Sequence, residues 1–140
     1  MPYKFLPDVA LADVAFEARE GTVEGLFVAC ATAMSDIMVD LSTVERKTTR
    51  RISLASPDLD RLLYDFLTEL IIVKDVDSLL FSEFDVDVSP DGTSLKASAT
   101  GEAIDREKHV LRNDVKAVTM HMFGVRKEGP EWVATVVLDI

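Results

Sequence analysis

An amphipathic stretch near the middle of the chain constrains the fold more than any other segment. From residue 59 onward apolar side chains recur every three or four positions, at Leu59, Leu62, Leu63, Phe66, Leu67, Leu70 and Ile71. This spacing predicts a helix that buries one continuous face. Ser56, Pro57 and Asp58 precede it and are typical of a helix start, with the serine as the cap. Such a helix needs a sheet or another helix to cover it.

A second helix is predicted from Thr22 to Leu41, because Thr22 is a suitable cap, Glu24 lies in the first turn, and the apolar residues keep helical spacing. Shorter apolar stretches bounded by turn residues indicate strands near residues 4–6, 11–18, 44–54, 84–88, 95–100 and 132–138, with a last hairpin turning at residues 127–130. The prediction is one α+β domain over residues 1–140. It has a largely antiparallel sheet of about seven strands, with both long helices packed on one face.

Four basic residues, Arg46, Lys47, Arg50 and Arg51, cluster on the predicted strand 44–54. They could form a basic patch for RNA or an acidic partner, or they could be the solvated edge of a sheet. Alternate residues of a strand face opposite ways, and no aromatic residue interleaves with the cluster. We therefore favour the edge strand.

Composition excludes several classes of protein. The formal net charge of −10 argues against a surface that binds nucleic acid strongly, since phosphate binding needs a basic face, and a protein partner is favoured instead. Cys30 is the only cysteine, which excludes an internal disulfide and zinc sites built on several thiolates. No apolar run approaches the roughly 20 residues of a membrane helix. The N-terminus lacks the long apolar segment and the small-residue cleavage site of a signal peptide. We expect a cytoplasmic protein.

The last third of the chain carries the candidate site. Residues 132–138 read as a buried strand that is followed by Asp139 and Ile140, so a side-chain carboxylate and a main-chain carboxylate lie at the edge of the core. Asp13 lies in a comparable apolar run, and we expect the two runs to meet. Oxygen donors without thiolate or imidazole select Ca²⁺, Mg²⁺ or Mn²⁺. The alternative is that Asp13 pairs with a lysine such as Lys116, or caps a turn.

No self-sufficient catalytic apparatus is evident. His109 and His121 are the only histidines, and neither belongs to a recognisable nucleophile motif; a phosphate-binding glycine loop is also missing. A metal-dependent hydrolase would have to use Asp13 and Asp139 with His121 as base. A general chaperone or binding module with a structural ion is the other alternative.

Five short motifs together resemble the archease family along essentially the whole chain. They are Leu11-Ala12-Asp13, Gly101-Glu102, Lys108-His109, the segment Val115-Lys116-Ala117-Val118-Thr119, and the final Asp139-Ile140. The chain departs from the family pattern at Ala10-Leu11, where members usually have His-Thr, and at Met120, where tyrosine is common.

The resemblance implies an accessory protein, not an enzyme. Archeases act with the tRNA-splicing RNA ligase, which joins RNA with GTP and a divalent metal; they promote its guanylylation and its repeated turnover. Some are described as chaperone-like modulators of tRNA-modifying enzymes such as a tRNA cytosine methyltransferase. The family's metal site, usually calcium, would carry over to Asp13, Asp139 and Ile140. The patch expected to contact the partner comprises Lys116, Thr119, His121, Glu102 and His109.

Overall fold

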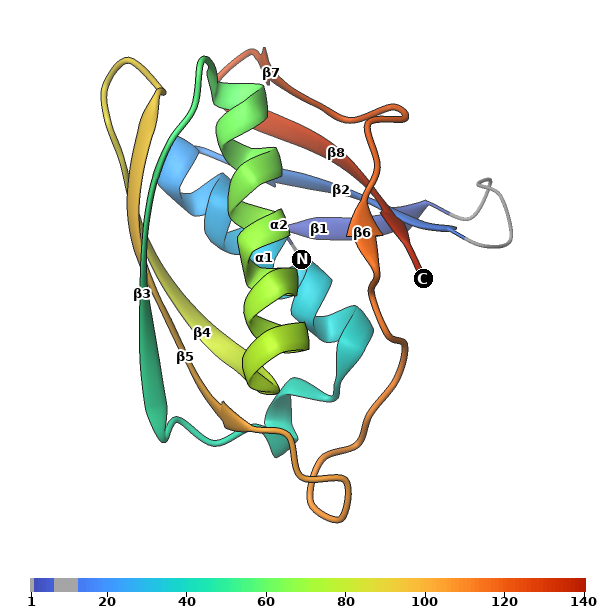
Figure 1. The fold of residues 1–140 in the computed structure, drawn as a ribbon. Helices are drawn as coiled ribbons and strands as arrows, with labels where there is room; N and C mark the ends of the chain where they lie inside the picture. Colours follow the sequence, from blue (N-terminus) through green and yellow to red (C-terminus); the bar gives the residue numbers. More distant parts are fainter. Residues whose placement is uncertain (1, 7–12) are drawn as a thin grey trace.

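The computed structural model describes residues 2–6 and 13–140 (Figure 1). In chain order the elements are β1 (Tyr3–Leu6), β2 (Asp13–Glu20), α1 (Val23–Met38), the short 3-10 helix η1 (Leu41–Thr43), β3 (Thr48–Ala55), α2 (Leu59–Asp77), β4 (Leu79–Val88), β5 (Ser94–Ala103), β6 (Ala117–Val118), β7 (Gly124–Glu128) and β8 (Glu131–Asp139). Two long helices among antiparallel strands confirm the predicted α+β class. The link between the predicted strands 4–6 and 11–18, and the first two residues of the second strand, lie outside the described residues.

The strands form two sheets, where the sequence suggested one. In the larger sheet the order is β1-β2-β8-β6, and β7 also pairs with β8; in the smaller sheet it is β3-β5-β4. Both helices lie between the sheets, and each of them contacts strands of both (Figure 1). Alternating polarity predicts a strand but does not reveal its neighbours, so the division into two sheets was not accessible from the sequence.

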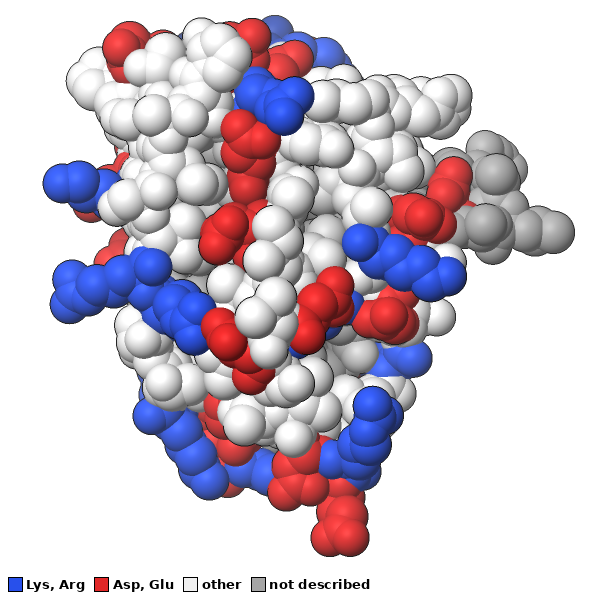
Figure 2. Space-filling view, viewed as in Figure 1, with Lys and Arg blue, Asp and Glu red and all other residues white. Residues whose placement is uncertain are grey.

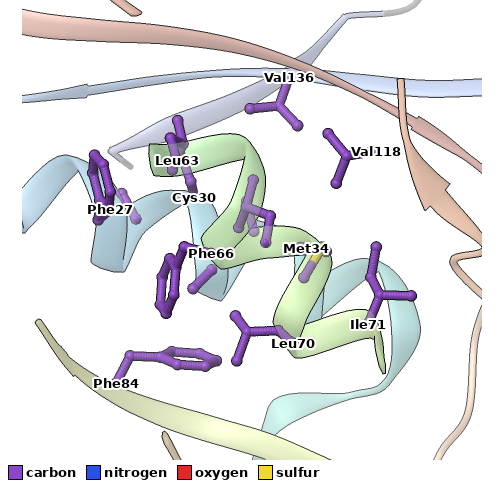
Figure 3. Packing of buried hydrophobic residues seen from close by; sticks show 14 of the residues in the cluster. Phe27, Cys30, Met34, Leu63, Phe66, Leu70, Ile71, Phe84, Val118 and Val136 are labelled. Carbon is purple, nitrogen blue, oxygen red and sulfur yellow. The ribbon is translucent and has the colours of Figure 1, made fainter. Parts of the chain in front are cut away.

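The core fills the space between the two sheets (Figure 3). Phe66 of α2 stacks on Phe27 of α1 with ring centroids 6.1 Å apart, and both side chains are fully buried. Phe84 of β4 covers the helices from one sheet, and Val136 of β8 covers them from the other (Figure 3). The stripe predicted on residues 59–71 is therefore the face that joins the two layers.

Both helices have ends that differ from the prediction. The cap of α2 is Asp58, not Ser56, because the Asp58 carboxylate is the group that accepts from the Arg61 N–H, at 2.9 Å. The Ser56 hydroxyl donates instead to Asp65 at 2.7 Å. The first helix, α1, ends at Met38, before Leu41. Neither helix of the described chain is long and apolar enough to span a bilayer.

The basic cluster lies on and before β3, an edge strand of the smaller sheet. Arg46 pairs with Glu83 at 3.0 Å, and Arg50 pairs with Asp77 at 2.8 Å. The edge-strand interpretation is confirmed, although β3 begins only at Thr48.

Residues 110–116 form neither a helix nor a strand. They run past the end of α1 and lead into β6, which pairs with β8, and we call this segment the strap. Its start is bonded to the end of α1, since the N–H groups of Arg112 and Asn113 donate to the carbonyls of Met38 and Ile37 at 2.8 and 3.0 Å. These carbonyls belong to the last turn of the helix, which lacks partners of its own. Just before the strap the chain makes one hydrogen-bonded turn of helical type, in which the His109 N–H donates to the Asp105 carbonyl at 2.8 Å.

Candidate functional site

The two aspartates of the predicted site lie side by side on adjacent strands of the larger sheet. Asp13 is the first residue of β2, Asp139 is the last of β8, and the two are direct partners in the antiparallel ladder. The Lys116 N–H donates to the Asp139 carbonyl at 2.8 Å, so the peptide groups of Asp139 point toward β6 and away from β2. The aspartates are therefore a non-hydrogen-bonded pair, the closer class, with Cβ atoms about 4.5–5.5 Å apart and side chains on one face. The expectation that the two apolar runs around Asp13 and Asp139 meet is confirmed.

Lys116 lies on the other flank of Asp139. It closes the strap immediately before β6, whose first residue, Ala117, is the ladder partner of Asp139. The Lys116 side chain is exposed. Asp13 and Lys116, both within the described residues, form no ion pair, so this arrangement does not show the alternative in which the lysine neutralises Asp13.

Thr119 and His121 continue the chain beyond β6. The Thr119 N–H donates to the Val137 carbonyl at 2.9 Å. The Thr119 hydroxyl oxygen is buried and has no hydrogen-bond partner among the residues described. His121 is exposed in the turn that follows, beside Met122, whose φ of 58° lies in the left-handed region. An unpaired buried hydroxyl is unfavourable unless something satisfies it, so Thr119 is the most unusual polar group of this edge.

The donors at the end of β8 have the chemistry of a hard-cation site. Asp13, Asp139 and Ile140 are all partly buried. Within residues 2–6 and 13–140, no group of three His, Cys, Asp or Glu side chains is placed to hold a metal ion. The aspartate pair therefore supplies two protein donors, and the third would be the main-chain carboxylate predicted at Ile140. All three are hard oxygen donors, which suit Ca²⁺ or Mg²⁺ rather than a soft metal.

Glu102 and His109 form a second, buried cluster. The Glu102 carboxylate accepts from Lys108 at 2.9 Å, from the Glu45 N–H at 2.6 Å and from His109 Nε2 at 3.0 Å. The His109 Nδ1 accepts from the Asp105 N–H at 2.9 Å, so Nε2 carries the ring proton and donates. The Lys108 ammonium foremost, with the other two donors, lowers the pKa of Glu102 to about 2. This network fastens the connection after β5.

The structure separates this buried cluster from the rest of the predicted patch. Glu102 belongs to β5 in the smaller sheet, whereas Lys116 and Thr119 flank β6 in the larger one. The His109 side chain is fully buried. A partner could touch Lys116 and His121 directly but would reach Glu102 and His109 only through other residues.

Charges of both signs are mixed over the face that α2 and the end of β8 share. Figure 2 shows acidic and basic side chains interspersed there, with no extended basic stripe among the residues drawn in colour or white. Neither sign of charge dominates this face.

A lysine that the sequence analysis passed over is buried near the strap. Lys74 lies in the last turn of α2 with 7% of its surface exposed. It follows Leu67 and Leu70 at helical spacing, so it continues the apolar stripe. A charged residue in line with a buried stripe was the signal that could have identified it.

Comparisons with known proteins match this arrangement over the whole chain. Residues 3–140 match the model of the Archease protein family. The chain belongs to the archease family. The archease of Methanothermobacter thermautotrophicus is 41% identical over 131 residues, covering 92% of this chain and 93% of the relative. The archease of Pyrococcus abyssi is 37% identical over 132 residues, with the same coverage.

Two solved structures share the archease fold. The solution structure of Methanobacterium thermoautotrophicum protein 1598 has a TM-score of 0.86 and 39% identity, and the match covers 99% of each chain. A Thermotoga maritima archease, described as a possible chaperone, has a TM-score of 0.64 and 16% identity over 96% of each chain, and this likeness concerns the fold alone. The resemblance drawn from five sequence motifs is thus confirmed. The metal ligands, the partner and the cytoplasmic location stay predictions.

Proposed function

We propose that this archease is an accessory protein of a GTP-dependent tRNA-splicing RNA ligase, and that it binds the ligase with the edge formed by the ends of β2, β8 and the strap. The observation that carries the proposal is the register of β2 and β8, which sets Asp13 directly opposite Asp139 while Lys116 flanks the same residue. Two like charges held opposite each other are unfavourable, and a bound cation or a basic partner removes that cost.

The carboxylates of Asp13, Asp139 and Ile140 are the groups that would hold a divalent cation, Ca²⁺ first, with Mg²⁺ and Mn²⁺ as alternatives. Such a cation supplies positive charge that can attract phosphate or a carboxylate of the partner. The buried Thr119 hydroxyl lies two residues farther along the same edge, beside Val137, and could bond a water molecule of the site. Lys116 and His121 are exposed, so they can meet the partner or its nucleotide directly.

The proposed role is activation of the ligase, and this role requires a minimum difference in binding free energy between two ligase states. A protein that raises the population of a reactive ligase state must bind that state more tightly than the resting state. A tenfold shift requires about 1.4 kcal/mol of differential binding. One well-formed contact between charged groups supplies an amount of this order, so the small set of Asp13, Asp139, Ile140 and Lys116 is sufficient.

The test is repeated ligation by the cognate ligase with GTP and divalent metal, in the presence and absence of the protein. We expect many RNA joints per ligase with the wild type and about one with Asp13→Asn. Asp85→Asn is the matched control, since it removes one exposed charge from β4, which belongs to the smaller sheet, whereas β8 belongs to the larger one. Full stimulation by a folded Asp13→Asn protein would overturn the assignment.

A second candidate role is chaperone-like support of a tRNA-modifying enzyme such as a tRNA cytosine methyltransferase. The description of the Thermotoga maritima relative as a possible chaperone favours it. Two exposed methionines, Met120 and Met122, lie beside the candidate edge, and methionine adapts well to varied partner surfaces. Protection of the methyltransferase without any effect on ligation would select this role.

A further inference from the structure

Lys74 makes an unusually complete set of contacts for a lysine near a helix end. Its ammonium donates to Asp114 Oδ1 at 2.5 Å and to the Val115 carbonyl at 2.8 Å, and it lies 2.9 Å from Asp75 Oδ1. Two of the three ammonium protons thus have hydrogen-bond acceptors, and both acceptors belong to the strap, while Asp75 adds a neighbouring negative charge.

The burial of Lys74 requires an explanation. A lysine near the end of a helix is favourable because it opposes the helix dipole, but an exposed side chain would serve that purpose. Burying an ammonium is unfavourable unless its hydrogen bonds are made. A leucine at this position would continue the stripe of Leu67 and Leu70. The polar head of Lys74 therefore serves its contacts with the strap.

The strap depends on such contacts because a cavity adjoins it. A pocket of about 380 Å³ lies between the strap and the helix ends, lined by Met38, Lys74, Leu80, Ile104, Arg112 and Asp114 among others. Packed side chains do not fill this space. Hydrogen bonds hold the strap at its start, through Arg112 and Asn113, and at its end, where the Lys116 N–H meets the Asp139 carbonyl.

We propose that Lys74 is a positioning residue for Lys116. By holding Asp114 and the Val115 carbonyl, it fixes the chain one residue before Lys116, whose N–H donates to the Asp139 carbonyl, and so sets the place from which the exposed Lys116 side chain projects. This inference rests on the proposed function of the Lys116 edge. It also links the end of α2 to that edge.

The experiment compares Lys74→Met, Lys116→Ala and the double variant in the ligase stimulation assay. Methionine keeps the length of the side chain and loses the three donors. We expect Lys74→Met to lower stimulation about tenfold. Because Lys74 would act through Lys116, we expect the double variant to be no worse than Lys116→Ala, which is the non-additive behaviour of residues in one network. Losses that multiply in the double variant would mean that Lys74 acts on general stability, and would overturn the inference. Lys96→Met is the matched control, because Lys96 is exposed on β5.

Amide hydrogen exchange tests the same inference without the ligase. In Lys74→Met the Lys116 and Thr119 amides should exchange at least several-fold faster, while amides in the β2–β8 ladder keep their protection. Unchanged exchange at Lys116 would overturn the inference. If Lys74→Met does not fold, Asp114→Ala removes one of the same contacts from an exposed side chain, and a faster Lys116 amide is expected there too. Should Lys116→Ala stimulate the ligase fully, the proposed function fails, and the exchange data still decide the role of Lys74.

Discussion

Replacing Asp13 by asparagine should have opposite effects on thermal stability without and with a divalent cation. The change keeps the shape of the side chain and removes one of two like charges that face each other across β2 and β8. Without the cation the variant loses only repulsion. With the cation it loses a ligand charge. The order of the two melting temperatures should therefore reverse.

The size of each effect follows from the register. Like charges at directly opposite positions of a sheet cost about 0.2–1 kcal/mol. For a chain of this size 1 kcal/mol corresponds to about 3 °C in melting temperature. In a chelating buffer the melting temperature of Asp13→Asn should thus equal that of the wild type or exceed it by up to about 3 °C. A cation at a hundred times its Kd adds about 2.7 kcal/mol to the wild type, or about 8 °C, and clearly less to the variant.

The assay is calorimetric or fluorescence-detected melting of wild type, Asp13→Asn and the control Asp85→Asn, over a series of Ca²⁺, Mg²⁺ and Mn²⁺ concentrations. The control should follow the wild type in its response to the cation. Equal cation-dependent gains in wild type and Asp13→Asn would refute the assignment of Asp13. A wild type that melts at one temperature throughout the series would refute the site as a whole.

Three further predictions concern the core, the buried glutamate and the chain end. Phe66→Ala should lower the free energy of unfolding by about 3–5 kcal/mol and Leu63→Ala by about 2–5 kcal/mol, because both side chains are fully buried. A wild-type melting temperature for either variant would contradict the packing. The wild type should lose stability as pH falls from 4.5 toward about 2, since the unfolded state takes up the Glu102 proton first, and Glu102→Gln should lack this part of the pH dependence. A few residues added after Ile140 should weaken Ca²⁺ binding by roughly tenfold to a hundredfold in titration calorimetry, whereas a tag before residue 2 should do much less; equal affinities would remove Ile140 from the site.

Local patterns predicted most of the fold. Helical spacing located α1 and α2, and turn residues located the last hairpin, where Gly129 adopts a positive φ of 61° that favours glycine. The partition into two sheets depends on pairings such as β3 with β5, which join residues far apart in sequence. Local periodicity carries no information on such pairings.

The candidate site was predictable in part for a similar reason. Asp13 and Asp139 were identified because each is an acid within an apolar run, and the register placed them together. Glu102 and His109 were grouped with them because motifs record which residues are present, not where they lie. Lys74 was missed because a lysine inside a helix is ordinarily exposed. Its place in the apolar stripe was a signal of burial, but its contacts with Asp114 and Val115 are visible only in the structure.

The most direct test of the proposed function is the rate at which the cognate ligase is guanylylated by GTP. The measurement follows covalent GMP on the ligase over time with wild-type protein, with Asp13→Asn and without addition. Faster labelling with the wild type, and a rate near the unassisted one with Asp13→Asn, is the predicted result. Identical labelling rates in all three reactions, with both proteins shown to be folded, would contradict the proposal that this archease activates the ligase.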